Sequence, residues 1–433
     1  MLASGLLYCI LLSCKTTKQA PNVDMGIETN INKDKAREET AGFLDSLLAR
    51  NLQYFSEVLK NRAAWNVQVM YTKIDRRVSG EPVLEHHRFN VNRNKYFYPA
   101  STVKLPIVLL ALQKLNALKN TGINRNTAMI TETAYSGQTE VFNDPESRDG
   151  KPSIANYIKK ILLVSDNDAY NRLYEFLGQD YINTELHKKG YKDVQILHRL
   201  NIFLSEEENR RTNPVQFYDD SGKIIYDQPA QINKTKYALR NDKFGEGYYS
   251  GGKLIKGPMD FSKKNRIGLE DLHEILISLV FPEQVSAAQR FNISEDDRLF
   301  VLKHMGMYPA ESIYPPYADN KKEYWPAYCK FILFGADKGK LPENIRSFNK
   351  PGDAYGHLLD VAYIVDFKNK IEFFVSAVIY CNSDGILNDD RYDYDSIGKP
   401  FMKNLGKVIY EYELKRNYKQ RPDLSPLLFS FDK

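Results

Sequence analysis

The segment 98–106 carries a serine and a lysine at a spacing that suits nucleophilic catalysis. Ser101 stands three residues before Lys104. On a helical turn, residues three apart are neighbours, so both side chains would lie on one face. A serine hydroxyl becomes a strong nucleophile when a base takes its proton. A lysine in a dry pocket can be that base, because burial lowers its pKa. The spacing therefore predicts Ser101 as a nucleophile and Lys104 as its general base.

The same Ser-x-x-Lys spacing occurs elsewhere in the chain, so the spacing alone is not specific. It also occurs at Ser250/Lys253, Ser347/Lys350 and Ser396/Lys399, among others. The copy at Ser101 differs because it opens the apolar run Leu105–Leu118, which has helical spacing. Pro106 either kinks this helix or marks its true first turn, where proline is favoured. In the second case Ser101 lies in an irregular turn; we expect the helix to include it.

Ser165-Asp166-Asn167 is a second segment that could do chemistry. It occurs once, 64 residues after Ser101, between two predicted helices. A hydroxyl and a carboxamide on a short loop can reach one cleft, where they pass protons and bind a substrate amide. The alternative is ordinary helix capping, since Ser, Asp and Asn are the favoured caps.

Lys350-Pro351-Gly352 is a third candidate and comes just before two apolar runs. A lysine at a strand edge could attract a substrate carboxylate, and a glycine lets a ligand approach the backbone. The alternative is a plain turn, because Pro-Gly is a common turn pair.

Composition restricts the class of protein. The chain has 433 residues, 42% hydrophobic and 27% charged, which is ordinary for a globular protein of two or three domain-sized units. The net charge is +5, from 60 basic and 55 acidic residues, and gives no reason to expect nucleic acid binding. No Cys/His spacing resembles a zinc site, so we predict no metal and no other cofactor. Cys329 and Cys381 either pair or stay as buried thiols.

The N-terminus departs from this globular pattern. Gly5–Leu12 is apolar and is followed by Ser13 and Cys14. Eight residues are too few to span a bilayer, which needs ~20, but they fit the apolar part of an export signal. Residues 1–14 resemble a bacterial lipoprotein signal, with Cys14 as the lipidated residue. The polar stretch 15–37 would be a tether, which predicts lipid anchoring on the periplasmic face of a membrane. The alternative is a frayed or core-packed segment.

The remaining pattern predicts an α/β (α+β) fold in residues 38–433. Its elements are a helix over 38–59, a strand over 66–75, helices from 105, 154, 168, 182, 268 and 294, apolar runs at 359–367 and 371–381 joined as a hairpin, and a last helix over 396–414. We expect residues 38–98 and 340–433 to form one layer, an antiparallel sheet with terminal helices. Residues 99–339 would form a helical subdomain, with a turn-rich hairpin insertion at 215–258. A site would lie in the cleft between them.

The order of the three motifs resembles the serine β-lactamases and penicillin-binding proteins, and most closely the class A β-lactamases, over residues 66–414. This resemblance implies that Ser101 is acylated, with Lys104 as the general base. Ser165 would relay a proton to the leaving nitrogen. Asn167 would bind the substrate amide and Lys350 its carboxylate.

The resemblance also implies an oxyanion hole and shows where this chain departs from the family. The hole would use the backbone N–H groups of Ser101 and Asp353. Gly352, the residue before Asp353, would let the substrate approach the backbone. Pro351 stands where the family has Thr or Ser, so a hydroxyl for the substrate carboxylate is lost. After His198-Arg199-Leu200, which resembles the start of the family's omega loop, the water-activating glutamate is expected near Leu204. Glu208 is our candidate, although it comes late.

We therefore predict a monomeric, membrane-tethered serine hydrolase that forms an acyl-enzyme. Its substrate would be a β-lactam or a cell-wall-like peptide amide or ester. One alternative is a slowly deacylating penicillin-binding protein. The other is a catalytically silent lipoprotein that uses the same fold as a binding or structural module.

Overall fold

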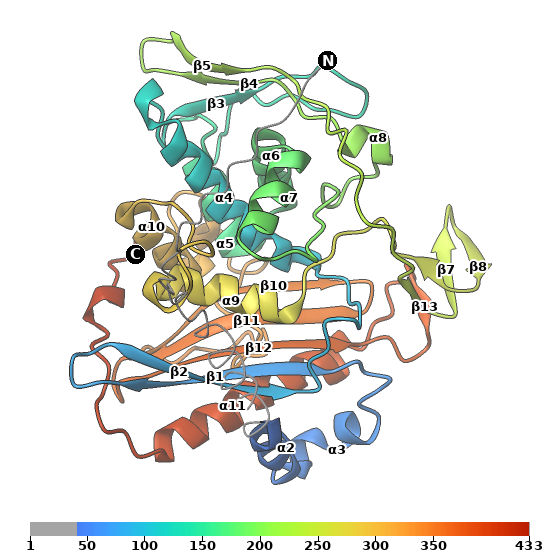
Figure 1. The fold of residues 1–433 in the computed structure, drawn as a ribbon, viewed down its shortest axis with the longest axis vertical. Helices are drawn as coiled ribbons and strands as arrows, with labels where there is room; N and C mark the ends of the chain where they lie inside the picture. Colours follow the sequence, from blue (N-terminus) through green and yellow to red (C-terminus); the bar gives the residue numbers. More distant parts are fainter. Residues whose placement is uncertain (1–40, 433) are drawn as a thin grey trace, which may run out of the picture. The chain divides into compact units, whose positions relative to one another are not determined.

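The computed structural model describes residues 41–432 (Figure 1). The predicted signal with Cys14 and the tether 15–37 lie outside the described residues. Within residues 41–432, no helix combines the length and the apolar character that crossing a membrane requires.

A five-stranded antiparallel sheet forms the centre of the fold, as predicted for the fold class. Its order is β10 (Ile345–Ala354), β11 (His357–Asp366), β12 (Ile371–Tyr380), β1 (Gln68–Arg76) and β2 (Pro82–Phe89). The two apolar runs form the predicted hairpin β11–β12. β1 comes from the other end of the chain and pairs with β12, so that Tyr71 lies opposite Val375. Every residue of β11 is buried, as expected for a strand covered on both faces.

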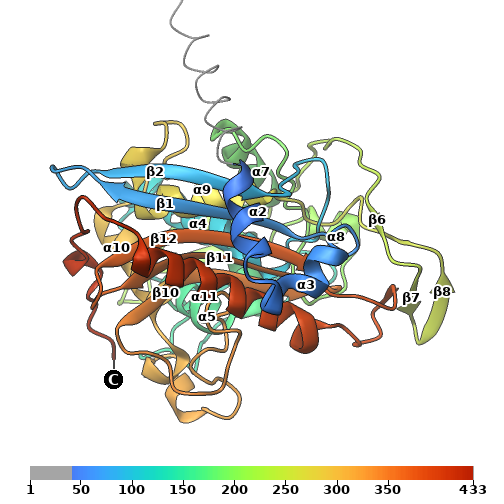
Figure 2. The ribbon, with the colours of Figure 1, turned by 90° about the horizontal axis from the view of Figure 1, so that it is seen from below.

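Helices cover both faces of this sheet. Figure 2 shows α2 (Ala41–Ala49), α3 (Leu52–Lys60) and α11 (Lys399–Lys415) together on one face. α4 (Lys104–Ala117) and α9 (Leu269–Val280) lie on the other face (Figure 1). Consecutive strand residues serve the two cores, because side chains alternate along a strand. Phe373 packs in the cluster below the sheet and Phe374 in the cluster above it.

The predicted single helix over 38–59 is wrong for its described part. The chain forms two helices there. α2 ends at Ala49 and α3 begins at Leu52, with Arg50 and Asn51 between them. Asn51 Nδ2 donates a hydrogen bond to the carbonyl oxygen of Leu47, at 2.8 Å. A side chain that bonds to the backbone in this way offers an alternative to the helical ladder. The apolar periodicity continued across the break and concealed it.

The helical part lies between β2 and β10 in the chain. Its remaining helices are α5 (Ile154–Val164), α6 (Asn167–Leu177), α7 (Gln179–Lys188), α8 (Glu206–Asn209) and α10 (Glu295–Gly306), with the short helices η2 (Lys119–Thr121), η3 (Pro282–Gln284), η4 (Pro309–Glu311) and η5 (Tyr317–Asp319). Most of α4 is buried, including Lys104 at its start. A helix that is buried nearly all round is a core helix. The predicted cap of α10 is present, with Ser294 Oγ accepting from Asp297 N.

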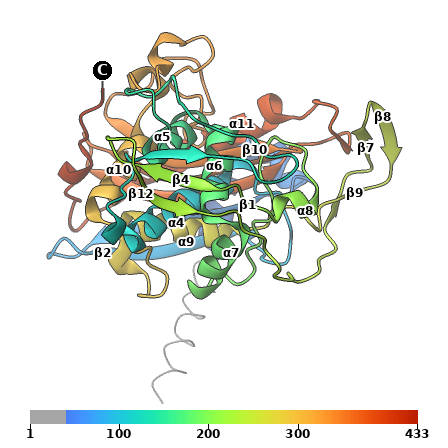
Figure 3. The same ribbon diagram turned by 90° about the horizontal axis from the view of Figure 1, so that it is seen from above.

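The predicted insertion over 215–258 contains two separate hairpins. In the first, β4 (Val215–Tyr218) and β5 (Ile224–Gln228) add to β3 (Ala128–Thr131). In the second, β7 (Gly247–Ser250) pairs with β8 (Lys253–Lys256) and, in parallel, with β13 (Ile386–Leu387). β6 (Lys243–Phe244) pairs with β9 (Met259–Asp260). Figure 3 shows β7 and β8 extending away from the helices.

The two cysteines of the described part are free. Cys329 and Cys381 are both buried and form no disulfide with each other. Of the two alternatives that the sequence left open, the structure has the buried thiols.

Candidate active site

Ser101 lies in a 3₁₀ turn that leads directly into α4. This turn, η1 (Ala100–Val103), ends where Lys104 begins the α-helix. The prediction that the α-helix includes Ser101 is therefore wrong, and the alternative of a turn before the helix is correct. Pro106 explains the change. It has no N–H to bond the carbonyl of Thr102, so the α-helical ladder cannot extend back through that position.

The turn still places the two side chains together. Lys104 Nζ lies 2.9 Å from Ser101 Oγ. The same nitrogen donates to the carbonyl oxygen of Ser165, at 2.5 Å, and to Asn167 Oδ1, at 2.7 Å, and lies 3.2 Å from Ser165 Oγ. Lys104 is fully buried. Burial, followed by the nearby positive charge of Lys350, holds the pKa of Lys104 well below its ordinary value. A neutral amine is the form that can accept a proton.

The loop between α5 and α6 contributes the second motif. Asp166 caps α6, because its carboxylate accepts from Ala169 N at 2.7 Å. Ser165 ends α5 with φ +61°, a left-handed conformation that is uncommon outside glycine. Ser165 and Asn167 both contact Lys104, as described above. Capping therefore accounts for Asp166 alone, and the two flanking residues face the site.

The third motif lies inside an edge strand and not in a turn. Lys350, Pro351 and Gly352 belong to β10, whose open edge contacts η1. Lys350 is fully buried, and its Nζ donates to Ser165 Oγ at 2.7 Å and to Pro351 O at 2.9 Å. Burial lowers the pKa of Lys350 to about 8. The Ser165 hydroxyl thus lies between two lysine amines, and polar contacts run from Ser101 through Lys104 and Ser165 to Lys350.

Gly352 lets β10 pack closely against the nucleophile turn. A Cβ atom at this position would lie 2.7 Å from Ser101 N and 2.9 Å from Thr102 N. Any side chain would push the strand and the turn apart. Because Pro351 O accepts from Lys350, this carbonyl points off the open edge of β10. Residues two apart on a strand face the same edge, so the N–H of Asp353 lies along that edge as well.

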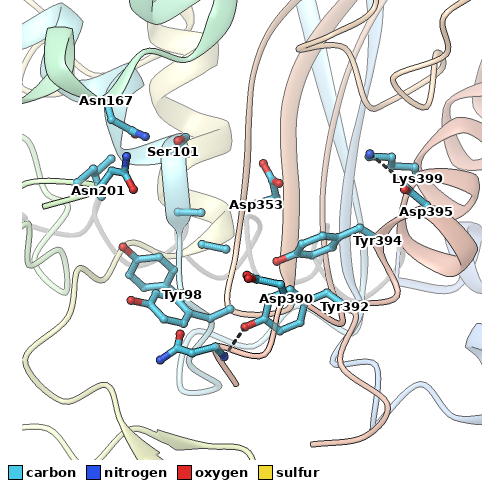
Figure 4. Close-up of a pocket in the computed structure, with 15 residues that line it drawn as sticks. Tyr98, Ser101, Asn167, Asn201, Asp353, Asp390, Tyr392, Tyr394, Asp395 and Lys399 are labelled. Atoms are coloured by element: carbon cyan, nitrogen blue, oxygen red, sulfur yellow. Dashed lines mark hydrogen bonds and ion pairs between the residues drawn. The ribbon is translucent and has the colours of Figure 1, made fainter. Parts of the chain in front are cut away.

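A cavity of about 590 Å³ opens beside this group. Ser101 and Asn167 line it, together with the backbone and side chain of Asp353 (Figure 4). The rest of its lining was not predicted and is rich in acidic and aromatic side chains: Asp390, Asp395, Tyr98, Tyr355, Tyr392 and Tyr394. Most of these residues come from the segment 388–395, which lies before the predicted last helix and outside every element that the sequence predicted. Desolvation by the surrounding protein raises the pKa of the Asp353 carboxyl. The side chain is nevertheless exposed to the cavity.

Glu208 is not brought to the site. Its carboxylate accepts from Ser205 N at 2.7 Å and Ser205 Oγ at 2.8 Å, which completes a capping box at the start of α8. Ser136 Oγ is a further donor to this carboxylate, and Glu208 does not line the cavity. The structure therefore uses this carboxylate as a helix cap. Its predicted role in activating water stays a prediction.

A buried ion-pair network holds the segment after His198. Arg199 Nε donates to Glu175 Oε1 at 2.9 Å, and Arg172 Nη1 donates to the other oxygen of Glu175 at 3.0 Å. Arg199 also donates to the carbonyl oxygens of Glu208 and Arg211. His198 stacks parallel to Tyr98, with ring centroids 6.1 Å apart. This segment follows the pattern that suggested an omega loop, and it supplies Leu200 and Asn201 to the cavity.

Residues 41–432 contain no cluster of three or more His, Cys, Asp or Glu side chains that could hold a metal ion.

Comparison with known proteins gives a family match and a set of similar solved structures. The family model of the β-lactamase enzyme family matches residues 52–241, which is less than half of the chain. No curated protein matches. Similar solved structures include a β-lactamase from Xanthomonas campestris, with 14% identity and a TM-score of 0.46 over 84% of this chain and 98% of that one. A class A β-lactamase from Clostridium kluyveri has 14% identity and a TM-score of 0.44 over 84% and 99%.

The matched segment contains the first two motifs, including Ser101, Lys104, Ser165 and Asn167. A family of this kind supports a serine hydrolase with a small-molecule substrate. The predicted resemblance of the chain to the serine β-lactamase superfamily is thereby confirmed.

Proposed function

We propose that this protein is a serine hydrolase that forms an acyl-enzyme on Ser101, with a β-lactam or a cell-wall-like peptide amide or ester as substrate. The observation that carries the proposal is the continuous group of polar contacts from Ser101 through Lys104 and Ser165 to Lys350. The Ser101 hydroxyl lines a cavity and lies 2.9 Å from a buried amine with a lowered pKa, so it has the surroundings of an activated nucleophile.

Acylation would proceed through a tetrahedral intermediate. Neutral Lys104 takes the proton of Ser101 Oγ, and this oxygen bonds to the carbonyl carbon of the substrate. The N–H groups of Ser101 and Asp353 then donate to the developing oxyanion. When the intermediate collapses, the bond to the leaving nitrogen or oxygen breaks. Ser165, which lies 3.2 Å from Lys104 Nζ, passes the proton to the leaving group. The product is an ester of Ser101.

Asn167 would orient the substrate. Its Oδ1 is occupied by Lys104, at 2.7 Å, which directs the Nδ2 donor elsewhere. A carboxamide has both an acceptor and two donors, so the free Nδ2 can bind the amide carbonyl of a substrate. Asn167 lines the cavity beside Ser101 (Figure 4).

We propose slow hydrolysis of the acyl-enzyme, as in penicillin-binding proteins. Within residues 41–432, Ser101 Oγ has its side-chain hydrogen bond with Lys104, and no carboxylate bonds to it. Glu208 serves as a helix cap, as described above. Without a positioned base to activate water, an acyl-enzyme persists. The rival function, a silent binding module, predicts no acylation at all.

Labelling with a fluorescent penicillin tests this function. We expect covalent label on the native protein and none on Ser101→Ala. Ser396→Ala is the matched control, because Ser396 belongs to another Ser-x-x-Lys copy and is exposed in η6 (Tyr394–Gly398). Label should persist for many minutes after free probe is removed. If neither penicillin nor an activated D-alanyl thioester labels the native protein, the binding module is the better account.

We also propose that the protein is tethered to the periplasmic face of a bacterial membrane through a lipidated Cys14. The support is the apolar run Gly5–Leu12 followed by Ser13-Cys14. Mass spectrometry of the protein purified from membranes tests this. A chain that begins at Cys14 and carries acyl groups is expected, and an unmodified chain that begins at Met1 would contradict the tether.

A further inference from the structure

The cavity wall opposite Ser101 carries net negative charge. Asp353, Asp390 and Asp395 line it, and Lys399 is the basic residue among the side chains of this wall. Figure 4 shows Asp353 between Ser101 and the pair Asp395–Lys399. Lys399 Nζ lies 2.6 Å from Asp395 Oδ1, so these two charges compensate each other. Asp353 and Asp390 form no ion pair within the described part of the chain, although the positive charges of Lys399, Lys350 and Lys104 act on the Asp353 carboxyl from nearby. Both carboxyl side chains line the cavity.

A substrate carboxylate placed directly against this wall would meet an unfavourable environment, so the carboxylate of a substrate would have to lie elsewhere in the cavity. Lys350 already donates to Ser165 and to Pro351 O, and Pro351 has no hydroxyl that could assist it. The next side chain along β10 that lines the cavity is the carboxyl of Asp353. Like charges placed close together are destabilising, so this wall disfavours an anionic group.

Tyrosine rings line the same cavity as the two carboxyls and are held in place. Tyr392 Oη accepts from Asn388 N, and Tyr394 Oη accepts from Gly356 N, both at 2.9 Å. The rings of Tyr392 and Tyr394 lie 5.2 Å apart. Aromatic faces attract organic cations through their quadrupole, and the attraction grows where water is excluded. Carboxyls among fixed aromatic rings are therefore suited to a protonated amine.

The second hairpin of the insertion braces this wall. β13 pairs in parallel with β7, and Asn388 Nδ2 donates to Tyr249 O at 3.1 Å. Glu246 N donates to Gly385 O at 2.7 Å. A Cβ at Gly245 would lie 2.8 Å from Gly385 O, so the two segments are in close contact. The insertion thus holds the loop that carries Asp390 and Tyr392 against the cavity.

We propose that this cavity selects an acyl donor that carries a protonated amine, which Asp353 and Asp390 bind. The inference rests on the proposed function, since it concerns the substrate of the same serine. The reacting carbonyl would lie at Ser101, and the amine would lie across the cavity against the tyrosine-lined wall. The wall and its bracing hairpin are features of this chain that the three motifs do not explain.

A matched pair of substrates tests the inference. Nα-acetyl-L-lysyl-D-alanyl-D-lactate keeps a free side-chain amine, and its Nε-acetylated analogue is neutral there. We expect kcat/KM for acylation of Ser101 to favour the amine by about tenfold, since a hydrogen bond to a charged group is typically worth this much. In the double variant Asp353→Asn/Asp390→Asn the ratio should fall to near one. Asp389→Asn is the control, because Asp389 is adjacent but does not line the cavity; its ratio should stay at the native value.

Two results would overturn the inference. One is equal kcat/KM for both substrates, and the other is a preference that survives the double variant. If neither substrate acylates Ser101, binding of both peptides to Ser101→Ala is measured by calorimetry. A preference for the amine that disappears with Asp353→Asn/Asp390→Asn then supports the cavity's selectivity while the proposed hydrolase fails. Equal binding would overturn the selectivity itself.

Discussion

Lys104 and Lys330 are both buried lysines, with 0% and 2% of their surfaces exposed. Burial lowers the pKa of both, to about 8 for Lys330 and well below the ordinary value for Lys104. Each Nζ has several oxygen partners. By burial and pKa alone, the two would be equal candidates for a general base.

Their partners differ in chemistry. Lys330 Nζ donates to Met305 O at 2.5 Å, Ser347 O at 2.9 Å and Asn349 Oδ1 at 2.8 Å. All three are acceptors with no proton to lose, so Lys330 acts as a cross-link between α10 and β10. Lys104 instead contacts two hydroxyls, and one of them lines a cavity. A buried amine becomes a catalytic base where such a hydroxyl and space for a substrate adjoin it.

The largest expected effect is that of Lys104→Met on acylation. Loss of a general base typically costs about 10²–10⁴ in rate, so labelling by a fluorescent penicillin should slow by about a thousandfold. Rates are compared per folded molecule, with folding checked by circular dichroism. Rapid labelling of Lys104→Met would show that another group takes the proton.

Lys330→Met is the matched control and sharpens the comparison. It removes a buried donor from three acceptors, and each unpaired buried group costs about 1–3 kcal/mol. We expect a lower free energy of unfolding, measured in urea, with labelling per folded molecule within a few-fold of native. A loss of labelling as large as that of Lys104→Met would mean that the two lysines cannot be distinguished by their partners.

Gly352→Ala should produce the next largest effect. The added Cβ would press on Ser101 N and displace one of the two oxyanion donors. Removal of such a donor typically costs about 10²–10³ in rate. Stopped-flow acylation kinetics measure this change. Gly339→Ala is the control, since nothing lies within 4 Å of a Cβ at that position. Equal rates for both variants would argue against close packing of β10 on the nucleophile turn.

The pH dependence of acylation should be bell-shaped. The rate rises with pH as Lys104 loses its proton, because only the neutral amine accepts one. It falls above about pH 8, where Lys350 loses the positive charge that faces Ser165 and the substrate. The alkaline fall should approach tenfold per pH unit. In Lys350→Arg the charge persists at high pH, so the fall should move beyond pH 10. An unchanged alkaline limb in that variant would assign the limb to another group.

Glu208→Gln should have the smallest effect. Glu208 caps α8 and lies outside the cavity, so release of label should change by less than about twofold, as for most surface substitutions. A decrease of a hundredfold would instead restore Glu208 as the water-activating base. That result would require the segment after His198 to rearrange in the acyl-enzyme.

The repeated Ser-x-x-Lys spacing shows how far the sequence could predict the site. Ser347 and Lys350 have the same spacing as Ser101 and Lys104, but they lie on β10. Residues three apart on a strand point to opposite faces, so only Lys350 reaches the site. The apolar run after Ser101 identified the helical copy, because helical periodicity is a local property that can be read from the chain. The fold class was predicted from the same periodicities.

The cavity wall and the place of the Glu208 carboxylate could not be predicted in this way. Asp390 and Tyr392 lie in a loop whose position depends on β13 pairing with β7, and Asn388 and Tyr249 are 139 residues apart. No local pattern indicates such a pairing. Glu208 was chosen by its distance from His198-Arg199-Leu200, but a capping box directs its carboxylate back to the backbone.

The sequence by itself determined the residue types at the centre, namely a hydroxyl, two amines and an amide, and most of the helices and strands around them. Local spacing and periodicity were sufficient for this. The tertiary structure decided which groups meet, since Lys104 lies 61 residues from Ser165 and Lys350 lies 185 residues from it. It also decided the burial that lowers the pKa of both lysines and the negative charge of the cavity wall. These properties depend on the surrounding protein, because a pKa and an electric field are set by every element packed around a group and not by the group's neighbours in the chain.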